Sequence, residues 1–265
     1  MNNIECEPVF IVGSARSGTS AMMIALRDGA QIPGYNEGHY LTMMHGMIKL
    51  ATDHMVSHKG RNPSPEVMLA HVNMEDVTND IMAMMKSRME THFKGHKVWM
   101  DKTPDGLMMR VIPYIVHMWP KARFIFTKRR AIENISSRLR KFKHLSFERN
   151  CEHWAQSMEL WQKFKSFIPE NQRIEVDQYD MGLKPLEVAE KIGQFLGLTN
   201  DQTKGVGNSL SHDRIESTGG NEKNLKGLHD LGWTEEELEI YNRLCSSINR
   251  EYGYSEDSTS YFLNN

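Results

Sequence analysis

The segment 13–20 reads Gly-Ser-Ala-Arg-Ser-Gly-Thr-Ser and combines small residues, hydroxyl groups and one cation. Its glycines have the spacing of loops that hold phosphate groups between a strand and a helix. Backbone N–H groups at the start of a helix point toward a bound anion, and the helix dipole favours the negative charge. The side chains and glycine expected at such an anion are Arg16, Ser17, Gly18, Thr19 and Ser20. The segment therefore predicts a phosphate-binding turn, although a nucleotide kinase would carry Lys at the position of Thr19.

A second group of cations follows an apolar run, in Arg123-Phe-Ile-Phe-Thr-Lys-Arg129-Arg130. Ser137 comes eight residues after Arg129. That is about two helical turns, so both side chains can face one phosphate group. Because a helix N-terminus disfavours cations, cations at this place indicate a bound anion. The remaining basic residues of the stretch would extend this site, meet an anionic acceptor or face solvent: Lys128, Arg130, Arg138, Arg140, Lys141 and Lys143.

Three more side chains are candidates for acting on a transferred group. Lys102 lies in Asp-Lys-Thr-Pro after the apolar run 97–100, and we expect it at the end of a strand near the phosphate-binding turn. Glu37 and His39 lie in a loop after the first helix, where either could take a proton from an acceptor. Histidine titrates near neutral pH, whereas a glutamate base needs apolar neighbours that raise its pKa.

The elements that would position these residues alternate between strand and helix. Short apolar runs predict strands at 8–13, 97–100, 123–127 and 173–176. Periodic apolar residues predict helices at 19–28, 39–58, 65–93, 104–119, 131–142, 147–168, 184–196 and 234–251. The polar, Gly-rich stretch 199–232 predicts a long loop or flap. This order indicates an α/β fold with a parallel sheet flanked by helices, in which ligands bind beyond the carboxyl ends of the strands.

The composition narrows the function classes. The 265 residues fit one domain, here taken as 1–265, with 32 basic and 34 acidic side chains and a net charge of −2. Such a balance argues against a nucleic-acid-binding domain. The three cysteines lack Cys-x-x-Cys spacing, so neither a disulfide framework nor a zinc site is expected. The early apolar run, at 9–12, is too short for a membrane span or a signal peptide, so we expect a cytoplasmic protein without a membrane partner.

The phosphate-binding turn resembles the 5′-phosphosulfate loop of sulfotransferases that use 3′-phosphoadenosine 5′-phosphosulfate (PAPS). Bacterial and tyrosylprotein-type members of that family carry Gly-x-Pro-Arg-Ser-Gly-Thr-Ser/Thr, which this chain matches except at Ala15. Arg129 and Ser137 align with the family's 3′-phosphate site, where Ala131 and Glu133 replace Pro and Asp. The family's basic Gly-rich loop would correspond to 217–227, which lacks the basic pair.

The resemblance implies a three-layer P-loop-type fold that moves a sulfuryl group from PAPS to a hydroxyl or amine and leaves adenosine 3′,5′-bisphosphate (PAP). It implies that Lys102 and Arg16 neutralise charge on the leaving group, and it favours Glu37 over His39 as the base. No metal ion would be required. The acceptor would be a small soluble molecule, such as a natural product or carbohydrate, bound by a helical insertion at about 36–94.

Two alternatives stay open from the sequence. The first is a P-loop small-molecule kinase that uses ATP and Mg²⁺, with Ser20 and Asp101 at the metal. The second is a nucleotide-binding scaffold with a degenerate site. The sequence leaves the oligomeric state unknown.

Overall fold

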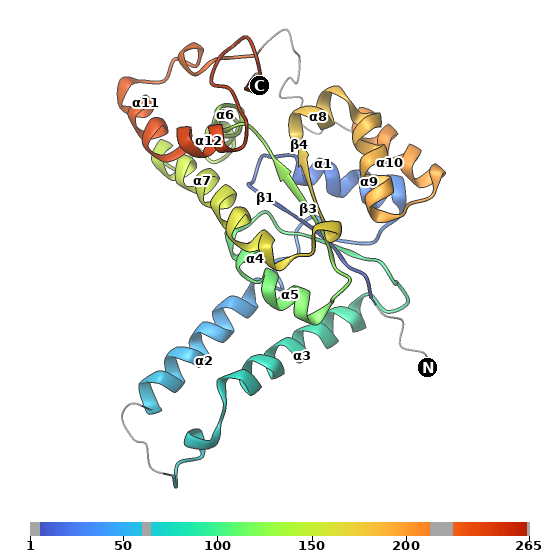
Figure 1. The fold of residues 1–265 in the computed structure, drawn as a ribbon, viewed down its shortest axis with the longest axis vertical. Coiled ribbons are helices and arrows are strands. Elements are labelled where there is room, and N and C mark those ends of the chain that lie inside the picture. The colour runs from blue at the N-terminus through green and yellow to red at the C-terminus, as the bar shows by residue number, and fades with distance from the viewer. Residues whose placement is uncertain (1–5, 60–64, 213–224, 264–265) are drawn as a thin grey trace.

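The protein is described by a computed structural model that covers residues 6–59, 65–212 and 225–263 (Figure 1). Its centre is a four-stranded sheet in the order β2-β1-β3-β4, with all three strand pairs parallel. The bounds are β1 Val9–Gly13, β2 Met100–Lys102, β3 Arg123–Lys128 and β4 Arg173–Asp177. All four predicted strands are confirmed, although β2 lies further along the chain than the apolar run suggested. The register places Lys102 opposite Ile11 and Thr127 opposite Gly13, so the carboxyl ends of the strands share one edge.

Helices cover both faces of the sheet, which confirms the three-layer α/β fold. Successive residues of β1 point to opposite faces, so Phe10 and Val12 enter one apolar core while Val9 and Ile11 enter the other. The first core is closed by α4 Gly106–Arg110, α5 Ile112–Met118, α6 Ala131–Lys141, α7 Phe147–Phe164, α11 Glu235–Tyr241 and α12 Ser247–Glu251. The second is closed by α1 Thr19–Ile24, α8 Gln178–Leu183, α9 Pro185–Leu196 and α10 Asn200–His212.

The prediction of a long loop at 199–232 is wrong for its first part, which forms α10. Glycines suggested a loop, but here they permit close packing. A Cβ added at Gly205 would lie 2.3 Å from the carbonyl oxygen of Gly29, so only glycine lets these two segments touch. Val206 and Leu210 of the same helix are buried in the second core. Residues 213–224 of this stretch, and with them most of the 217–227 counterpart, lie outside the described residues.

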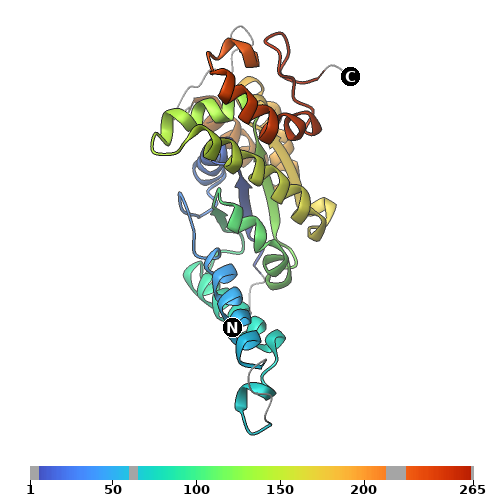
Figure 2. The same cartoon turned by 90° about the vertical axis from the view of Figure 1, so that its left-hand side faces the viewer.

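Two long helices, α2 Met43–Lys59 and α3 Met74–His92, run side by side and project from the body of the protein (Figures 1 and 2). The helix predicted at 65–93 begins later than expected, at Met74. It follows a cap in which the Asn73 side chain accepts a hydrogen bond from the N–H of Glu75. Met82, Met85 and Met89 of α3 are buried, which fits methionine as a filler of apolar cores. Within the described ranges, no helix is both long and apolar enough to cross a membrane.

Two further predicted helices form with internal breaks. The stretch 104–119 divides into α4 and α5 at Val111. The stretch 234–251 consists of α11, a π-helical turn at Asn242–Ser246 and α12. This stretch starts with a capping box, in which the side chains of Thr234 and Glu237 each accept a hydrogen bond from the backbone N–H of the other residue.

Candidate functional site

The predicted phosphate-binding turn, residues 13–20, joins β1 to α1 at the shared strand edge, as the sequence predicts. Gly13 must be glycine, because a Cβ there would lie 2.3 Å from the carbonyl oxygen of Thr127 on β3. Gly18 precedes α1 with a φ of 88°, a left-handed conformation that glycine adopts without strain. Arg16 is also left-handed, with a φ of 74°, which is uncommon for a residue with a side chain. The turn is therefore held in one specific shape by its neighbours.

Residues at the start of α6 and just before it fasten this turn. The Asn134 side-chain amide donates to the carbonyl oxygen of Ala15 at 3.0 Å and to the Ser17 hydroxyl at 2.9 Å. Arg129 donates to the carbonyl oxygen of Arg16 at 3.1 Å. The Arg16 Nε in turn donates to the Ser137 hydroxyl at 3.0 Å. The structure thus brings together Arg16, Arg129 and Ser137.

Sequence reasoning missed Asn134, although one signal was available. Asn134 and Ser137 are three residues apart, and residues at that spacing lie on the same side of a helix. The Oδ1 atom of Asn134 is buried and has no hydrogen-bond partner among the described residues. Of the predicted hydroxyls in the turn, Ser17 and Thr19 are buried and Ser20 is exposed.

The cations at this turn raise one another's electrostatic energy. Burial lowers the pKa of Arg129, and the charge of Arg16 lowers it further, while Tyr261, Glu133 and Asp177 act in the opposite direction. Burial and the neighbouring Arg140 also lower the pKa of Arg16. A bound anion would stabilise both guanidinium groups, so the charge distribution fits the predicted phosphate site.

The predicted catalytic side chains meet at the end of β2. The Lys102 Nζ donates to the Glu37 Oε1 at 3.0 Å, and the His39 Nε2 lies 2.7 Å from the Glu37 Oε2. The Lys102 side chain is only 3% exposed, whereas that of Glu37 is 47% exposed. Lys102 is therefore a buried cation whose charge is balanced by a half-exposed carboxylate, and not a surface lysine.

The expectation that apolar neighbours raise the pKa of Glu37 is wrong for this structure. Partial burial acts to raise the pKa, but hydrogen bonds and charge from His39 and Lys102 outweigh it, so the net pKa is lowered. The cause was not visible in the sequence, because Lys102 is 65 positions away from Glu37.

The loop that carries Glu37 and His39 is docked on β2. The N–H of Gly38 donates to the carbonyl oxygen of Lys102 at 3.3 Å, and the N–H of His39 donates to the Thr103 hydroxyl at 3.1 Å. Thr103 donates to the Asp101 Oδ1 at 2.7 Å. A Cβ on Gly38 would lie 2.1 Å from the Asp101 Oδ2, so the loop can pass over this buried carboxylate only with glycine at that position. Burial raises the pKa of Asp101.

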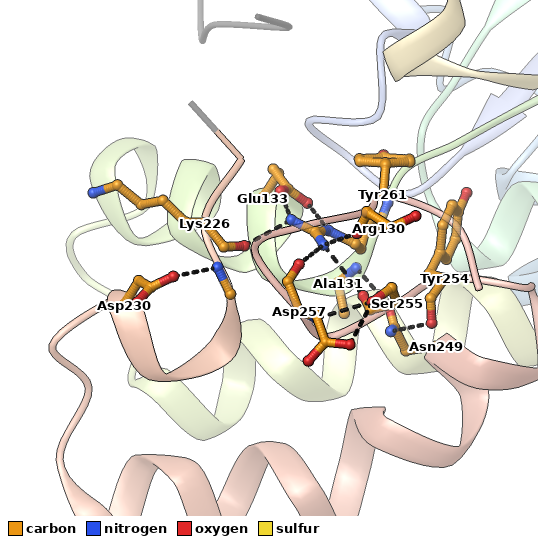
Figure 3. A network of polar contacts seen from close by, with 12 residues as sticks. Arg130, Ala131, Glu133, Lys226, Asp230, Asn249, Tyr254, Ser255, Asp257 and Tyr261 are labelled. Atoms are coloured by element: carbon orange, nitrogen blue, oxygen red, sulfur yellow. Dashed lines mark hydrogen bonds and ion pairs between the residues drawn. The ribbon is translucent and has the colours of Figure 1, made fainter. Parts of the chain in front are cut away.

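Arg130 is a buried residue that stabilises the fold and is not part of an exposed surface (Figure 3). It is buried, forms an ion pair with Glu133, and donates to carbonyl oxygens of the C-terminal segment 225–263. The backbone N–H of Arg130 donates to the Tyr261 hydroxyl and that of Ala131 to the Asn249 side chain, both at 3.0 Å. The C-terminal segment therefore satisfies the first donors of α6, and the hypothesis that Arg130 extends an anion site or faces solvent is wrong.

The other basic residues of the stretch divide by exposure. Lys128 forms an ion pair with Glu175 at 3.0 Å. Arg138 is buried between α6 and α7. The exposed cations are Arg140, Lys141 and Lys143. Among the residues that the structure describes, no group of three His, Cys, Asp or Glu side chains is arranged to hold a metal ion.

Comparisons with known proteins agree with this fold. The sulfotransferase family matches residues 8–202. A search of curated proteins found no match. The sulfotransferase domain of the Synechococcus PCC 7002 olefin synthase has a TM-score of 0.59 at 16% identity, over 96% of this chain and 98% of that one. The sulfotransferase domain of the curacin biosynthetic pathway has a TM-score of 0.50 at 15% identity, over 90% of this chain and 97% of that one. Sulfotransferase STF9 from Mycobacterium avium has a TM-score of 0.50 at 13% identity, over 92% of this chain and 77% of that one. At these identities the structures share the fold.

Proposed function

We propose that this chain, which belongs to the sulfotransferase family, transfers a sulfuryl group from PAPS to a hydroxyl or amine of a small soluble acceptor and releases PAP. The observation that carries this proposal is the pairing of two clusters at one strand edge. One is the anion site of Arg16, Arg129 and Ser137. The other is the trio of Lys102, Glu37 and His39 at the end of the neighbouring strand.

The donor would be held at both of its anionic ends. The turn 13–20 would bind the 5′-phosphosulfate through its backbone N–H groups and the hydroxyls of Ser17, Thr19 and Ser20. Arg129 and Ser137 would bind the 3′-phosphate. Burial and the charge of Arg16 lower the pKa of the buried Arg129 guanidinium. A phosphate dianion would stabilise this charged group, which supports the assignment.

Arg16 and Lys102 would stabilise the leaving group. Negative charge grows on the bridging oxygen as the sulfuryl group departs, and a fixed cation there acts most strongly in the transition state. Lys102 is nearly fully buried, so water screens its charge little. These two cations would supply the charge that the reaction requires, and the proposal includes no metal ion.

Glu37 would act as the base, with His39 as the group that holds it. In the structure, one carboxylate oxygen of Glu37 accepts a hydrogen bond from Lys102 and the other lies 2.7 Å from the His39 Nε2. If Lys102 turns to the donor, the Oε1 of Glu37 becomes available to take the acceptor's proton. Loss of the Lys102 hydrogen bond would also raise the pKa of Glu37 and make it a stronger base. His39 as the base, oriented by Glu37, is the alternative assignment.

The acceptor would bind beside the loop 36–39 and the first turn of α2. Two of the structures with this fold are domains of natural-product assembly systems, an olefin synthase and the curacin pathway, which supports a natural product as the acceptor. Only the start of α2 follows directly on this loop, and much of the α2–α3 hairpin projects from the body (Figure 2). We therefore place the acceptor-binding part of the helical insertion at its base.

Thermal unfolding with nucleotides tests the donor. PAP at about a hundred times its dissociation constant should stabilise the protein by about 2.7 kcal/mol. Arg129→Gln should remove most of that effect, and the control Lys141→Gln, which removes an exposed charge from the end of α6, should not. Stabilisation by ATP–Mg²⁺ but not by PAP would favour a kinase, and stabilisation by neither would favour a degenerate scaffold. An acceptor screen with ³⁵S-labelled PAPS then identifies the substrate.

A further inference from the structure

The helix α3 carries a row of exposed residues that no other described part of the chain covers. Asp80, Met84 and Arg88 follow one another at a spacing of four residues, so they form one continuous row on the helix surface. All three are exposed, and half of the Met84 side chain is accessible to solvent. Another side of the same helix buries Met82 and Met85. The hairpin that carries the row projects from the body of the protein (Figure 2).

The two charges of this row have no counter-charge within the chain. On the same helix Lys86 forms an ion pair with Glu90. Asp80 and Arg88, by contrast, form no ion pair with another described residue. Asp76 lies one turn before Asp80, and like charges at that spacing repel each other within a helix. A cation from outside α3 would therefore stabilise Asp80, as an acid from outside would stabilise Arg88.

The helix dipole does not account for this arrangement of charges. A dipole favours acids near the start of a helix and bases near its end, but the effect falls off within the first and last turns. Asp80 is the seventh and Arg88 the fifteenth of the 19 residues of α3, so both lie beyond those turns. The order of acid, apolar residue and base along the row therefore calls for a different partner.

The row is complementary to itself. Asp80 and Arg88 lie four residues before and four residues after Met84, so reversing the row exchanges acid and base around the same apolar centre. Rows of residues spaced by four are inclined to the helix axis, and two helices that cross at about 50° bring two such rows parallel. In an antiparallel pair of α3 helices, the Asp80 of each copy then lies beside the Arg88 of the other. Ala83 and Ser87 flank the row with small exposed side chains, which lets a second helix approach closely.

We propose that the row of Asp80, Met84 and Arg88 is a self-association surface, through which two copies of this chain pair by antiparallel α3 helices with Met84 at the two-fold axis. In such a dimer both copies use the same patch, so the patch must complement itself, as this row does. The contact is a single pair of helices and is smaller than a standard stable interface, so the dimer is weak and depends on concentration. This surface does not depend on the proposed transfer of a sulfuryl group.

Charge reversal tests the pairing of the two copies. Sedimentation velocity over about a hundredfold range of protein concentration measures the monomer–dimer equilibrium of wild type, Asp80→Arg and Arg88→Asp. Each variant alone should associate at least about tenfold more weakly, because like charges then face each other between the copies. An equimolar mixture of the two variants should associate again, because each row then meets a row of opposite charge. The control Asp53→Arg reverses an exposed acid on α2 and should leave association unchanged.

A covalent cross-link tests the position of the two-fold axis. In Met84→Cys the introduced thiols of the two copies should face each other, so mild oxidation by air should join them in a covalent dimer. Val56→Cys is the matched control, because Val56 is an exposed apolar residue of α2 and lies outside the row. Wild-type protein treated in the same way reports any cross-link through Cys6, which is a free cysteine and only partly buried.

Wild-type protein that stays monomeric over the whole concentration range overturns the proposal. A dimer that neither charge reversal weakens also overturns it and assigns the association to another face. The same holds if the mixed variants fail to associate, or if Val56→Cys forms the covalent dimer as readily as Met84→Cys. The substitutions change exposed side chains and should leave the fold intact, which circular dichroism of each variant checks before its association is measured.

Discussion

The ion pair between Lys102 and Glu37 should respond unequally to the loss of either partner. Lys102→Met removes a buried ammonium and leaves a carboxylate that is 47% exposed and still contacts His39. Water can solvate that carboxylate, so we expect a cost within about 1 kcal/mol, as for exposed ion pairs. Glu37→Gln leaves the ammonium, 3% exposed, without a counter-charge. We expect that change to cost about 1–3 kcal/mol at pH 7, because a buried charge loses its partner.

The effect should depend on pH in a defined direction. Burial acts to raise the pKa of Glu37 in the folded protein. The hydrogen bonds and charges of His39 and Lys102 outweigh burial and lower this pKa below its ordinary value. Its ionised form therefore stabilises the fold above the unfolded pKa of about 4.3, and this contribution disappears as the pH falls through the lowered folded value. The difference between wild type and Glu37→Gln should thus be constant from pH 7 to about 5.5 and shrink below about 4.

Urea unfolding of wild type, Lys102→Met and Glu37→Gln at pH 7, 5 and 3 measures these differences. The exposed pair of Lys49 and Asp53 on α2 offers a control, because removing either of its charges should cost similar, small amounts. A larger loss of unfolding free energy in Lys102→Met than in Glu37→Gln at pH 7 would refute the reasoning that the buried lysine depends on Glu37.

In activity assays, Lys102→Ala should lower kcat at saturating PAPS by about a hundredfold, and Lys102→Arg should restore part of it.

Three further outcomes follow from named contacts. Arg129→Ala should raise the donor KM with little change in kcat, because its contact holds donor and product alike; a large loss of kcat in steady-state assays at saturating donor would contradict the 3′-phosphate assignment. Gly38→Ala should lower kcat but keep PAP affinity, since its Cβ would lie 2.1 Å from Asp101 and displace the loop of Glu37 and His39; unchanged turnover would show that this loop does not position the base. Arg130→Met should lower the free energy of unfolding by about 3 kcal/mol or more, because it leaves Glu133 and several buried carbonyl oxygens without their donor; urea unfolding at wild-type stability would contradict this account of Arg130.

Much of the fold was predictable because its signals are local. The strand 9–13 is a short apolar run that ends in glycine, and the strands at 123–127 and 173–176 are also short and rich in apolar residues. Once strands and helices alternate, the sheet must be parallel and the strand ends must share an edge. That rule predicted that the turn 13–20 and the residues after the strand 123–127 would lie at the same edge, where the structure places Arg16 in contact with Ser137, 121 positions away.

The failures arise where a residue's role is set by a distant partner. Gly205 reads as a loop residue until Gly29 is packed against it. Arg130 reads as a surface cation until the C-terminal segment supplies carbonyl oxygens more than 90 positions away. No local pattern specifies either contact, because glycine and arginine both occur in loops, in cores and at binding sites.

The residues that would do chemistry were easier to predict than the residues that support them, and the reason is chemical. Binding an anion or moving a proton requires particular side chains, so Arg16, Lys102 and Glu37 stand out by type. Support requires only a donor or acceptor at the right place, so Asn134 and Thr103 carry no distinctive signal. Yet the support determines the chemical state: the pKa of Glu37 is lowered because the loop docked on β2 holds it beside His39 and against Lys102. The reactivity of this carboxylate therefore depends on the fold that surrounds it, and under the proposed mechanism it would change if Lys102 turned toward a bound donor.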